Sequence, residues 1–224
     1  MNNPRLVWDA RFFVLDARNL SPRYDPWIGA WLNLPLNQPG RKPGERVLDL
    51  GCGTGRDSRY MAGMGYDVVS LDLSREALRI CRQVAPRAAQ LQVDIQHGLP
   101  FRDGSFKFIL ANLSLHYFDW LVTESIVLEV KRCLKKEGML LLRLNSTEDV
   151  NHGAVGYPEL APHLFLVEGE QKRFFDRDSI RRLFNTGWMV HSLKKMNIDM
   201  DTDDINTEPK VVWEIILGKV SVHT

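Results

Sequence analysis

Ten residues, Val47 to Arg56 (VLDLGCGTGR), restrict the fold of this chain more than any other stretch of its sequence. A short apolar run leads into three glycines at alternate positions, and helical periodicity follows through about Met64. Gly51, Gly53 and Gly55 allow a tight turn, and they let a ligand approach the backbone without meeting a Cβ atom. A strand, a glycine loop and a helix in this order predict an α/β unit with a ligand-binding loop.

The same alternation continues to about Asn145. Apolar runs typical of buried strands are separated by segments with helical periodicity, which predicts βαβ units and a parallel sheet. The predicted strands cover residues 47–50, 67–71, 90–93, 106–111 and 139–144. The predicted helices cover residues 56–64, a segment capped by Ser74, and residues 120–135, with Gly138 as the residue that ends the last of them.

The last part of the chain departs from this pattern. Asp176 is a suitable N-cap for a helix through Phe184. Residues 188–193 and 211–217 are typical of two long strands, joined by an acidic loop at 199–204. Such a hairpin would break the strictly parallel arrangement.

A chain of 224 residues can bury one substantial core, so we expect a single domain over residues 1–224. Residues 1–44 are interpreted as an N-terminal helical extension and a linker, and residues 45–145 as the ligand-binding core. Residues 146–175 lack clear periodicity and are a candidate lid. Residues 176–224 supply the last helix and the C-terminal β-hairpin.

The composition argues against several classes of protein. Lys and Arg number 29 and Asp and Glu number 28, so the formal net charge is +1 and a dedicated nucleic-acid-binding protein is not expected. No apolar run approaches the roughly 20 residues of a membrane span, and the polar N-terminus does not resemble a secretory leader. We therefore expect a cytoplasmic protein without a membrane partner. The three cysteines are far apart, so neither a disulfide framework nor a metal site is expected.

Three acids at the ends of successive predicted strands indicate which ligand the loop binds. Asp49 can attract an ammonium group, Asp72 can accept both hydroxyls of a ribose, and Asp94 can accept a hydrogen bond from an exocyclic amine. An amino-acid ammonium, a ribose diol and an adenine amine together describe S-adenosylmethionine. A dinucleotide fits less well, because the third glycine comes one residue early and Asp49 would repel a pyrophosphate.

Four segments carry a resemblance to a known family: VLDLGCGTGRDS at 47–58, VVSLDLS at 68–74, VDIQHGLPFRDGSFKFILANLSLHYF at 93–118, and LKKEGMLLLRLN at 134–145. In this order and spacing the chain resembles a class I S-adenosylmethionine-dependent methyltransferase of the small-molecule type, similar to the methyltransferase domain 11 and tellurite-resistance group. The resemblance implies a Rossmann-like, doubly wound sheet of seven strands. The sheet is expected to be mostly parallel, with a reversed C-terminal strand and with helices on both faces.

The resemblance also implies a set of cofactor-binding residues. Those expected at the methionine part belong to the glycine loop and to the end of the fourth strand: Asp49, Gly51, Cys52, Gly53, Thr54, Gly55, Asn112 and Leu113. Those expected around the nucleoside are Asp72 at the ribose, Asp94 at the adenine amine, and Leu73 and Ile95 on the two faces of the adenine ring.

His116 is the candidate catalytic residue, because it lies four positions after Asn112 and an imidazole suits a general base near neutral pH. The alternative interpretation is a histidine that packs beside Tyr117. A soft acceptor such as a thiol needs only to be held in line with the methyl group, whereas an alcohol or an amine also needs a base. The acidic loop at 199–204 would disfavour an anionic acceptor if it lay near the pocket.

Two further groups of residues have a structural interpretation. The N-terminal extension is rich in aromatic residues, which are expected to pack in the core rather than roof the cofactor: Trp8, Phe12, Phe13, Tyr24, Trp27 and Trp31. The basic run Lys131-Arg132 with Lys135-Lys136 is interpreted as a solvated helix face.

The sequence therefore predicts an enzyme that transfers a methyl group from S-adenosylmethionine to a small-molecule acceptor by in-line displacement and releases S-adenosylhomocysteine. Two alternatives remain open. One is methylation of a protein or RNA side group, and the other is a non-catalytic partner protein that binds S-adenosylmethionine. We expect a monomer or a homodimer whose partner is a small molecule and not nucleic acid.

Overall fold

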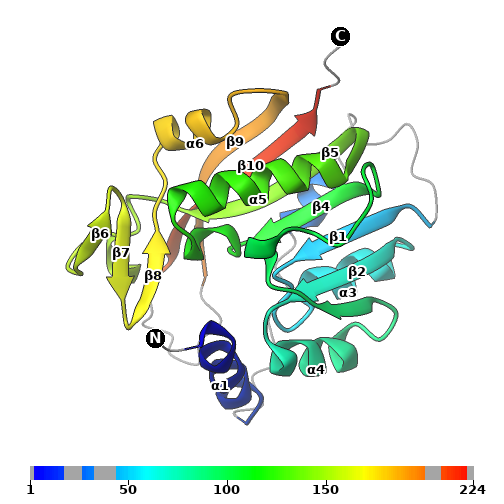
Figure 1. The fold of residues 1–224 in the computed structure, drawn as a ribbon, viewed down its shortest axis with the longest axis horizontal. Coiled ribbons are helices and arrows are strands. Elements are labelled where there is room, and N and C mark those ends of the chain that lie inside the picture. The colour runs from blue at the N-terminus through cyan, green and yellow to red at the C-terminus, as the bar shows by residue number, and fades with distance from the viewer. Residues whose placement is uncertain (1–2, 18–26, 33–43, 200–207, 221–224) are drawn as a thin grey trace.

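A seven-stranded sheet forms the centre of the molecule (Figure 1). The computed structural model describes residues 3–17, 27–32, 44–199 and 208–220. The strands are β1 (Arg46–Leu50), β2 (Asp67–Asp72), β3 (Ala89–Gln92), β4 (Phe106–Asn112), β5 (Leu134–Asn145), β9 (Trp188–Ile198) and β10 (Lys210–Lys219). They follow the order β3-β2-β1-β4-β5-β10-β9, and every neighbouring pair is parallel except those that include β10. The predicted sheet with a reversed C-terminal strand is confirmed.

Helices cover both faces of this sheet, as predicted. One face carries α2 (Trp27–Leu32), α3 (Arg56–Gly63) and α4 (Arg75–Val84), and the other carries α5 (Trp120–Cys133) and α6 (Arg177–Leu183). Alternate residues of a strand point to opposite faces, so each strand contributes to both cores. In β1, Leu48 and Leu50 pack with α5 and α6, whereas Val47 packs with α2, α3 and α4.

The order of the strands reverses between β1 and β4. The chain proceeds from β1 to β2 and β3 in one direction, and from β4 to β5 in the other. In doubly wound sheets, the crevice at the carboxyl ends of the strands on either side of this point is where ligands bind. The loops after β1, β2, β4 and β5 all open at this carboxyl edge.

The segment 146–175, expected to lack regular structure, forms a short 3₁₀ helix η4 (Val150–His152) and a second, three-stranded antiparallel sheet. Its strands are β6 (Glu159–Ala161), β7 (Leu164–Val167) and β8 (Glu170–Arg173). The expectation was wrong because these strands are too short to show a period of two. In β7 the two end residues, Leu164 and Val167, are buried, which is not an alternating pattern.

The junction of α5 and β5 also differs from the prediction. The helix ends at Cys133 instead of residue 135, and Leu134 already pairs with Phe106 of β4. Glu137, with φ 57°, takes the left-handed conformation expected for Gly138. Gly138 is needed for a different reason, since a Cβ there would lie 2.9 Å from the carbonyl oxygen of Lys135. The glycine allows close backbone packing in an irregular strand and does not cap the helix.

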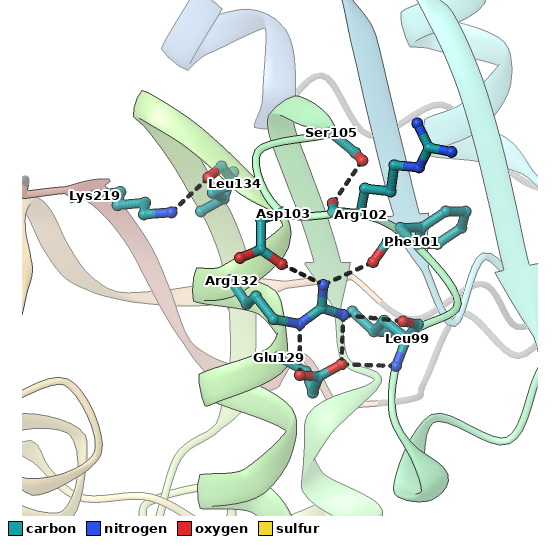
Figure 2. Close-up of polar contacts among 9 residues, drawn as sticks. All are labelled: Leu99, Phe101, Arg102, Asp103, Ser105, Glu129, Arg132, Leu134 and Lys219. Carbon is teal, nitrogen blue, oxygen red and sulfur yellow. Dashed lines mark hydrogen bonds and ion pairs between the residues drawn. The ribbon is translucent and has the colours of Figure 1, made fainter.

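Arg132 is not part of a solvated basic face, as the sequence had been interpreted. Figure 2 shows its guanidinium between α5 and the loop that precedes β4. It donates to both carboxylate oxygens of Glu129 at 2.7 and 2.8 Å, and to the carboxylate of Asp103 at 2.8 Å. It also donates to the carbonyl oxygens of Leu99 at 3.0 Å and Phe101 at 2.7 Å. We call Glu129 and Arg132 with these loop contacts the α5 clamp.

The N-terminal extension forms α1 (Pro4–Ala17), which lies against α4 beside the carboxyl edge of the large sheet (Figure 1). Asp9 fixes it there by accepting hydrogen bonds from the Ser74 hydroxyl at 2.6 Å and the Glu76 N–H at 3.2 Å. The prediction that the aromatic residues of the extension pack in the core is confirmed for Trp27 and Trp31 of α2. It is wrong for Phe13, whose side chain is 64% exposed. Tyr24 and most of the predicted linker lie outside the described residues. None of the helices in the described part of the chain could cross a membrane.

Candidate functional site

The glycine loop joins β1 to α3 at the point where the strand order reverses. Gly51 and Gly55 have φ angles of 72° and 84° and no room for a side chain. A Cβ on Gly51 would lie 2.5 Å from Ser114 Cβ, and one on Gly55 would lie 2.6 Å from Cys81 Sγ. These two glycines therefore allow close packing against the β4 loop and α4. Cys52 and Thr54, on the same loop, are partly exposed.

Asp72, at the end of β2, is bonded directly to this loop. Its carboxylate accepts the Gly53 N–H at 2.9 Å and the Ser74 N–H at 2.9 Å. Burial raises the pKa of this carboxyl, and the backbone hydrogen bonds oppose that effect. Each carboxylate oxygen can accept a second hydrogen bond, so Asp72 can still take up the two hydroxyls of a ribose.

The other residues expected around the nucleoside lie directly after β2 and after the next strand, β3. Leu73 follows Asp72, and its carbonyl oxygen accepts from the Gln92 amide at 2.9 Å. Asp94 caps the short helix η2 (Ile95–His97) by accepting the Gln96 N–H at 3.1 Å. Ile95 is 9% exposed and belongs to the core on the α5 side. Contacts of these three residues with an adenine stay predictions.

Asp49 points into the protein beneath the glycine loop. It is 2% exposed and accepts the Ser58 hydroxyl at 2.6 Å. Burial, and then the neighbouring carboxylate of Asp57, raise its pKa well above the usual range. Its expected contact with an ammonium group stays a prediction.

A further acid in this region, Asp57, is not among the site residues expected from the sequence. Its carboxylate accepts the Trp27 indole N–H at 3.1 Å and the Asn112 amide at 3.0 Å. Burial raises its pKa in spite of these bonds. The signal was available, because an acid two residues after the last glycine of such a loop lies at a helix N-terminus facing the ligand crevice.

The end of β4 carries polar atoms that are buried without a partner. Among the described residues, neither Asn112 Oδ1 nor Ser114 Oγ makes a hydrogen bond. Leu113, between them, has a left-handed backbone with φ 54°, which is strained for a residue with a side chain. Buried polar groups normally have partners, so these atoms indicate a site that a ligand completes.

His116 lies on the short helix η3 (Leu115–Tyr117), directly after this edge. It is 2% exposed, its Nδ1 has no partner within the described part of the chain, and its ring packs 4.1 Å from that of Tyr117. Burial, and then Lys210, Lys172 and Arg11, hold its pKa well below the usual range, so the imidazole is neutral at pH 7. Its catalytic role stays a prediction.

Helix α1 covers the carboxyl edge between these residues. The Trp8 ring packs edge-to-face on the Tyr117 ring, with 4.8 Å between the ring centroids. The Phe12 ring lies over Gly53, where a Cβ atom would be 3.5 Å from Phe12 Cζ. Two of the aromatic residues therefore lie over the site, which had been the less favoured interpretation. The fold thus brings the glycine loop, Asp72, Asn112 and His116 together under one helix.

The histidines and the tyrosine of segment 146–175 lie elsewhere. His152 bonds to Asp149 at 2.8 Å, whereas Tyr157 and His163 are exposed. His163 lies 3.9 Å from a carboxylate oxygen of Asp176.

Comparison with known proteins gives consistent matches. A family model described as a methyltransferase domain matches residues 48–142. The putative methyltransferase YqeM of Bacillus subtilis is 34% identical over an alignment of 207 positions, and this alignment covers 78% of this chain and 83% of that protein. A malonyl-[acyl-carrier protein] O-methyltransferase of Enterobacter lignolyticus is 36% identical over 95 residues, 42% of this chain and 37% of that protein. The chain spans less than half the length of several curated relatives that it matches.

Among solved structures, an S-adenosylmethionine-dependent methyltransferase from Methanosarcina mazei has the same fold. It superposes with a TM-score of 0.66 at 19% identity, over 84% of this chain and 99% of that one.

Proposed function

Because this chain belongs to the class I S-adenosylmethionine-dependent methyltransferases, we propose that it transfers the methyl group of that cofactor to a small-molecule acceptor by in-line displacement. The observation that carries the proposal is the bond from the Gly53 N–H, in the loop at the reversal point of the sheet, to Asp72 at the end of the neighbouring strand β2. It joins the two groups that this cofactor needs, a glycine loop and a carboxylate for the ribose, at one edge.

The residues present fit the cofactor. Asp72 would hold the ribose, and the unpartnered Asn112 Oδ1 and Ser114 Oγ could bond to the polar methionine end. Asp57, bonded to Asn112, is a second acid near Asp49, where an ammonium group is expected. When bound, the cofactor supplies a methyl group on a sulfonium, which is already an activated leaving group. The chain itself then has to orient the acceptor and exclude water.

A small acceptor is supported by the closure of the site. His116 is 2% exposed and α1 lies across the edge that carries it, which favours a small acceptor over a bulky one. The malonyl-[acyl-carrier protein] O-methyltransferases among the relatives support transfer to a small acyl group. Their alignments cover less than half of either chain, so the acceptor does not follow from them.

Calorimetry with S-adenosylmethionine, S-adenosylhomocysteine and NAD tests the cofactor. We expect the first two to bind at one site per chain and NAD to give no signal. Binding of NAD without the other two would overturn the proposal. Transfer of a radiolabelled methyl group to peptides or tRNA, but to no small molecule, would replace the small acceptor by a macromolecular one.

A further inference from the structure

The acceptor side of the site is identified by the order of the strands. The residues expected at the adenine and the ribose lie near the carboxyl ends of β3 and β2, and those expected at the methionine end lie near the carboxyl ends of β1 and β4. The next strands in the sheet are β5 and β10. A methyl acceptor beyond the methionine end therefore meets the carboxyl end of β5, the start of β10 and whatever packs on them.

Buried polar atoms without partners continue onto this side. Asn145, the last residue of β5, is fully buried, and in the described part of the chain neither atom of its side-chain amide has a hydrogen-bond partner. The same holds for His116 Nδ1 on η3. An amide with an unused donor and an unused acceptor is costly to bury unless a ligand bonds to it.

Three cations converge on the same place from elements that are distant in sequence. Lys210 begins β10 and is 7% exposed, and the β10–β5 pairing brings this strand beside Asn145. Lys172 lies on β8, which is fixed to η3 by the bond from the Gln171 amide to the Tyr117 carbonyl oxygen at 2.9 Å. Arg11 lies on α1, which reaches the same place through the Trp8–Tyr117 contact.

The carboxylates near these cations leave Lys172 free for a ligand. Lys210 pairs with Asp149 at 3.0 Å, and Arg11 pairs with Glu170 at 3.4 Å. Within the described ranges, the Lys172 side chain makes no hydrogen bond or ion pair. Burial lowers its pKa, followed by the repulsion of Lys210 and Arg11, and Glu168 and Glu170 oppose this only in part. Among the residues that the structure describes, the charged groups that shift the pKa of His116 are the cations Lys210, Lys172 and Arg11.

We propose that the methyl acceptor is a carboxylic acid in its ionised form, held by Lys172 and Lys210 beside His116 and Asn145. This inference rests on the proposed methyl transfer. A carboxylate is already a nucleophile at neutral pH and needs no base, which suits a neutral histidine surrounded by cations. Two ammonium groups and an amide N–H are suitable donors for its oxygens.

The reaction balances without a proton transfer. A carboxylate oxygen forms a bond to the methyl carbon as the carbon–sulfur bond breaks, and the electron pair of that bond remains on sulfur. One negative and one positive charge disappear, so the products are a neutral methyl ester and a thioether. Loss of charge is favoured where water is excluded, as around Asn145 and His116.

Binding and turnover together test the proposal. The protein saturated with S-adenosylhomocysteine is titrated with benzoate and with short and long straight-chain carboxylic acids, each matched by its primary amide. We expect acids to bind at least about tenfold more tightly than their amides. With labelled S-adenosylmethionine, the label should enter the acids only, and mild alkali should release it as methanol, as from a methyl ester.

Lys172→Gln is the test variant, and it removes one positive charge at the acceptor side. Lys136→Gln is the matched control, and it removes the same charge at an exposed position near the start of β5. Lys172→Gln should weaken acid binding about tenfold or more and leave binding of S-adenosylhomocysteine unchanged, whereas Lys136→Gln should change neither. An NMR titration of His116 should show a higher pKa in Lys172→Gln, because one cation is removed.

Three results would overturn the carboxylate acceptor while S-adenosylhomocysteine still binds. They are equal or absent binding of acids and amides, an alkali-stable label on a thiol, amine or phenol, and no effect of Lys172→Gln on acids. If the unaltered protein binds neither S-adenosylmethionine nor S-adenosylhomocysteine, the proposed function itself is overturned instead.

Discussion

Asp72 is a side chain that stabilises the fold and is also the proposed acceptor for a ligand. Its two oxygens fix the glycine loop and the start of the next helix through the N–H groups of Gly53 and Ser74. This holds the loop in one shape before any ligand arrives, so less ordering is needed on binding. The same oxygens are the proposed acceptors for the ribose hydroxyls.

Replacing Asp72 by alanine should therefore weaken binding of S-adenosylmethionine by one to several orders of magnitude. Two hydrogen bonds to a charged acceptor are lost, at about 1.5–3 kcal/mol each. Asp67→Ala is the matched control, since Asp67 begins the same strand but pairs with Arg46 at the surface. Calorimetry measures both affinities, and an unchanged affinity in Asp72→Ala would remove this residue from the site.

At the scale of elements, the α5 clamp fixes helix α5 to the loop that precedes β4. The guanidinium bonds to loop carbonyl oxygens and to Glu129, and Glu129 also accepts the Leu99 N–H at 3.0 Å. The Arg132 side chain holds the pKa of Glu129 down to about 2, since it favours the charged carboxylate.

The clamp predicts an acid-dependent stability. Because the pKa of Glu129 is lower in the folded protein than the roughly 4.3 of an unfolded chain, its contribution is complete above that value and is lost as the pH falls towards 2. Glu129→Gln should lower the free energy of unfolding at pH 7 and flatten its decline between about pH 5 and pH 3. Urea unfolding across this range measures both.

The control for the clamp is Glu76→Gln. Glu76 and Arg79 have the same spacing on α4 and an N–O distance of 2.8 Å, but the Glu76 carboxylate bonds within its own helix. If the free energy of unfolding of Glu129→Gln falls as steeply between about pH 5 and pH 3 as that of the unaltered protein, the clamp does not contribute to the acid dependence of stability.

At the scale of the whole molecule, a buried ion pair joins the reversed strand to the parallel part of the sheet. Arg143 of β5 lies 2.6 Å from Glu214 of β10, and both side chains are almost fully buried. The Trp31 indole of α2 donates to the same carboxylate at 2.8 Å. One acid thus connects two strands and a helix that are far apart in sequence.

Glu214→Ala should lower the free energy of unfolding by about 3–5 kcal/mol, because it removes the nearest carboxylate from a buried guanidinium and the acceptor of the indole. Glu148→Ala, which breaks the surface pair of Glu148 with Lys195, should cost less than about 1 kcal/mol. Chemical denaturation measures both. An equal loss of unfolding free energy in the two variants would show that burial of the Arg143–Glu214 pair does not increase its contribution to stability.

The sequence by itself determined the features whose causes are local. A strand followed by Gly51, Gly53 and Gly55 requires a tight turn into a helix, and Asp72 at the end of the next apolar run follows from the same alternation. The order of the strands and the reversed final strand came from the family pattern of these pieces. Together they predicted the fold and where the cofactor edge lies.

Only the tertiary structure decided which cations lie near His116 and that residues 146–175 form a small sheet. Arg11, Lys172 and Lys210 are separated by up to 199 positions, and no periodicity relates them, so only the tertiary fold brings their charges close enough to lower the pKa of His116. The sequence had suggested that an acidic loop disfavours an anion, but 199–204 lies almost wholly outside the described residues. Local sequence patterns depend on backbone geometry and therefore predict strands, turns and helices. The charge around a group such as His116 is instead the sum over side chains that are far apart in the sequence.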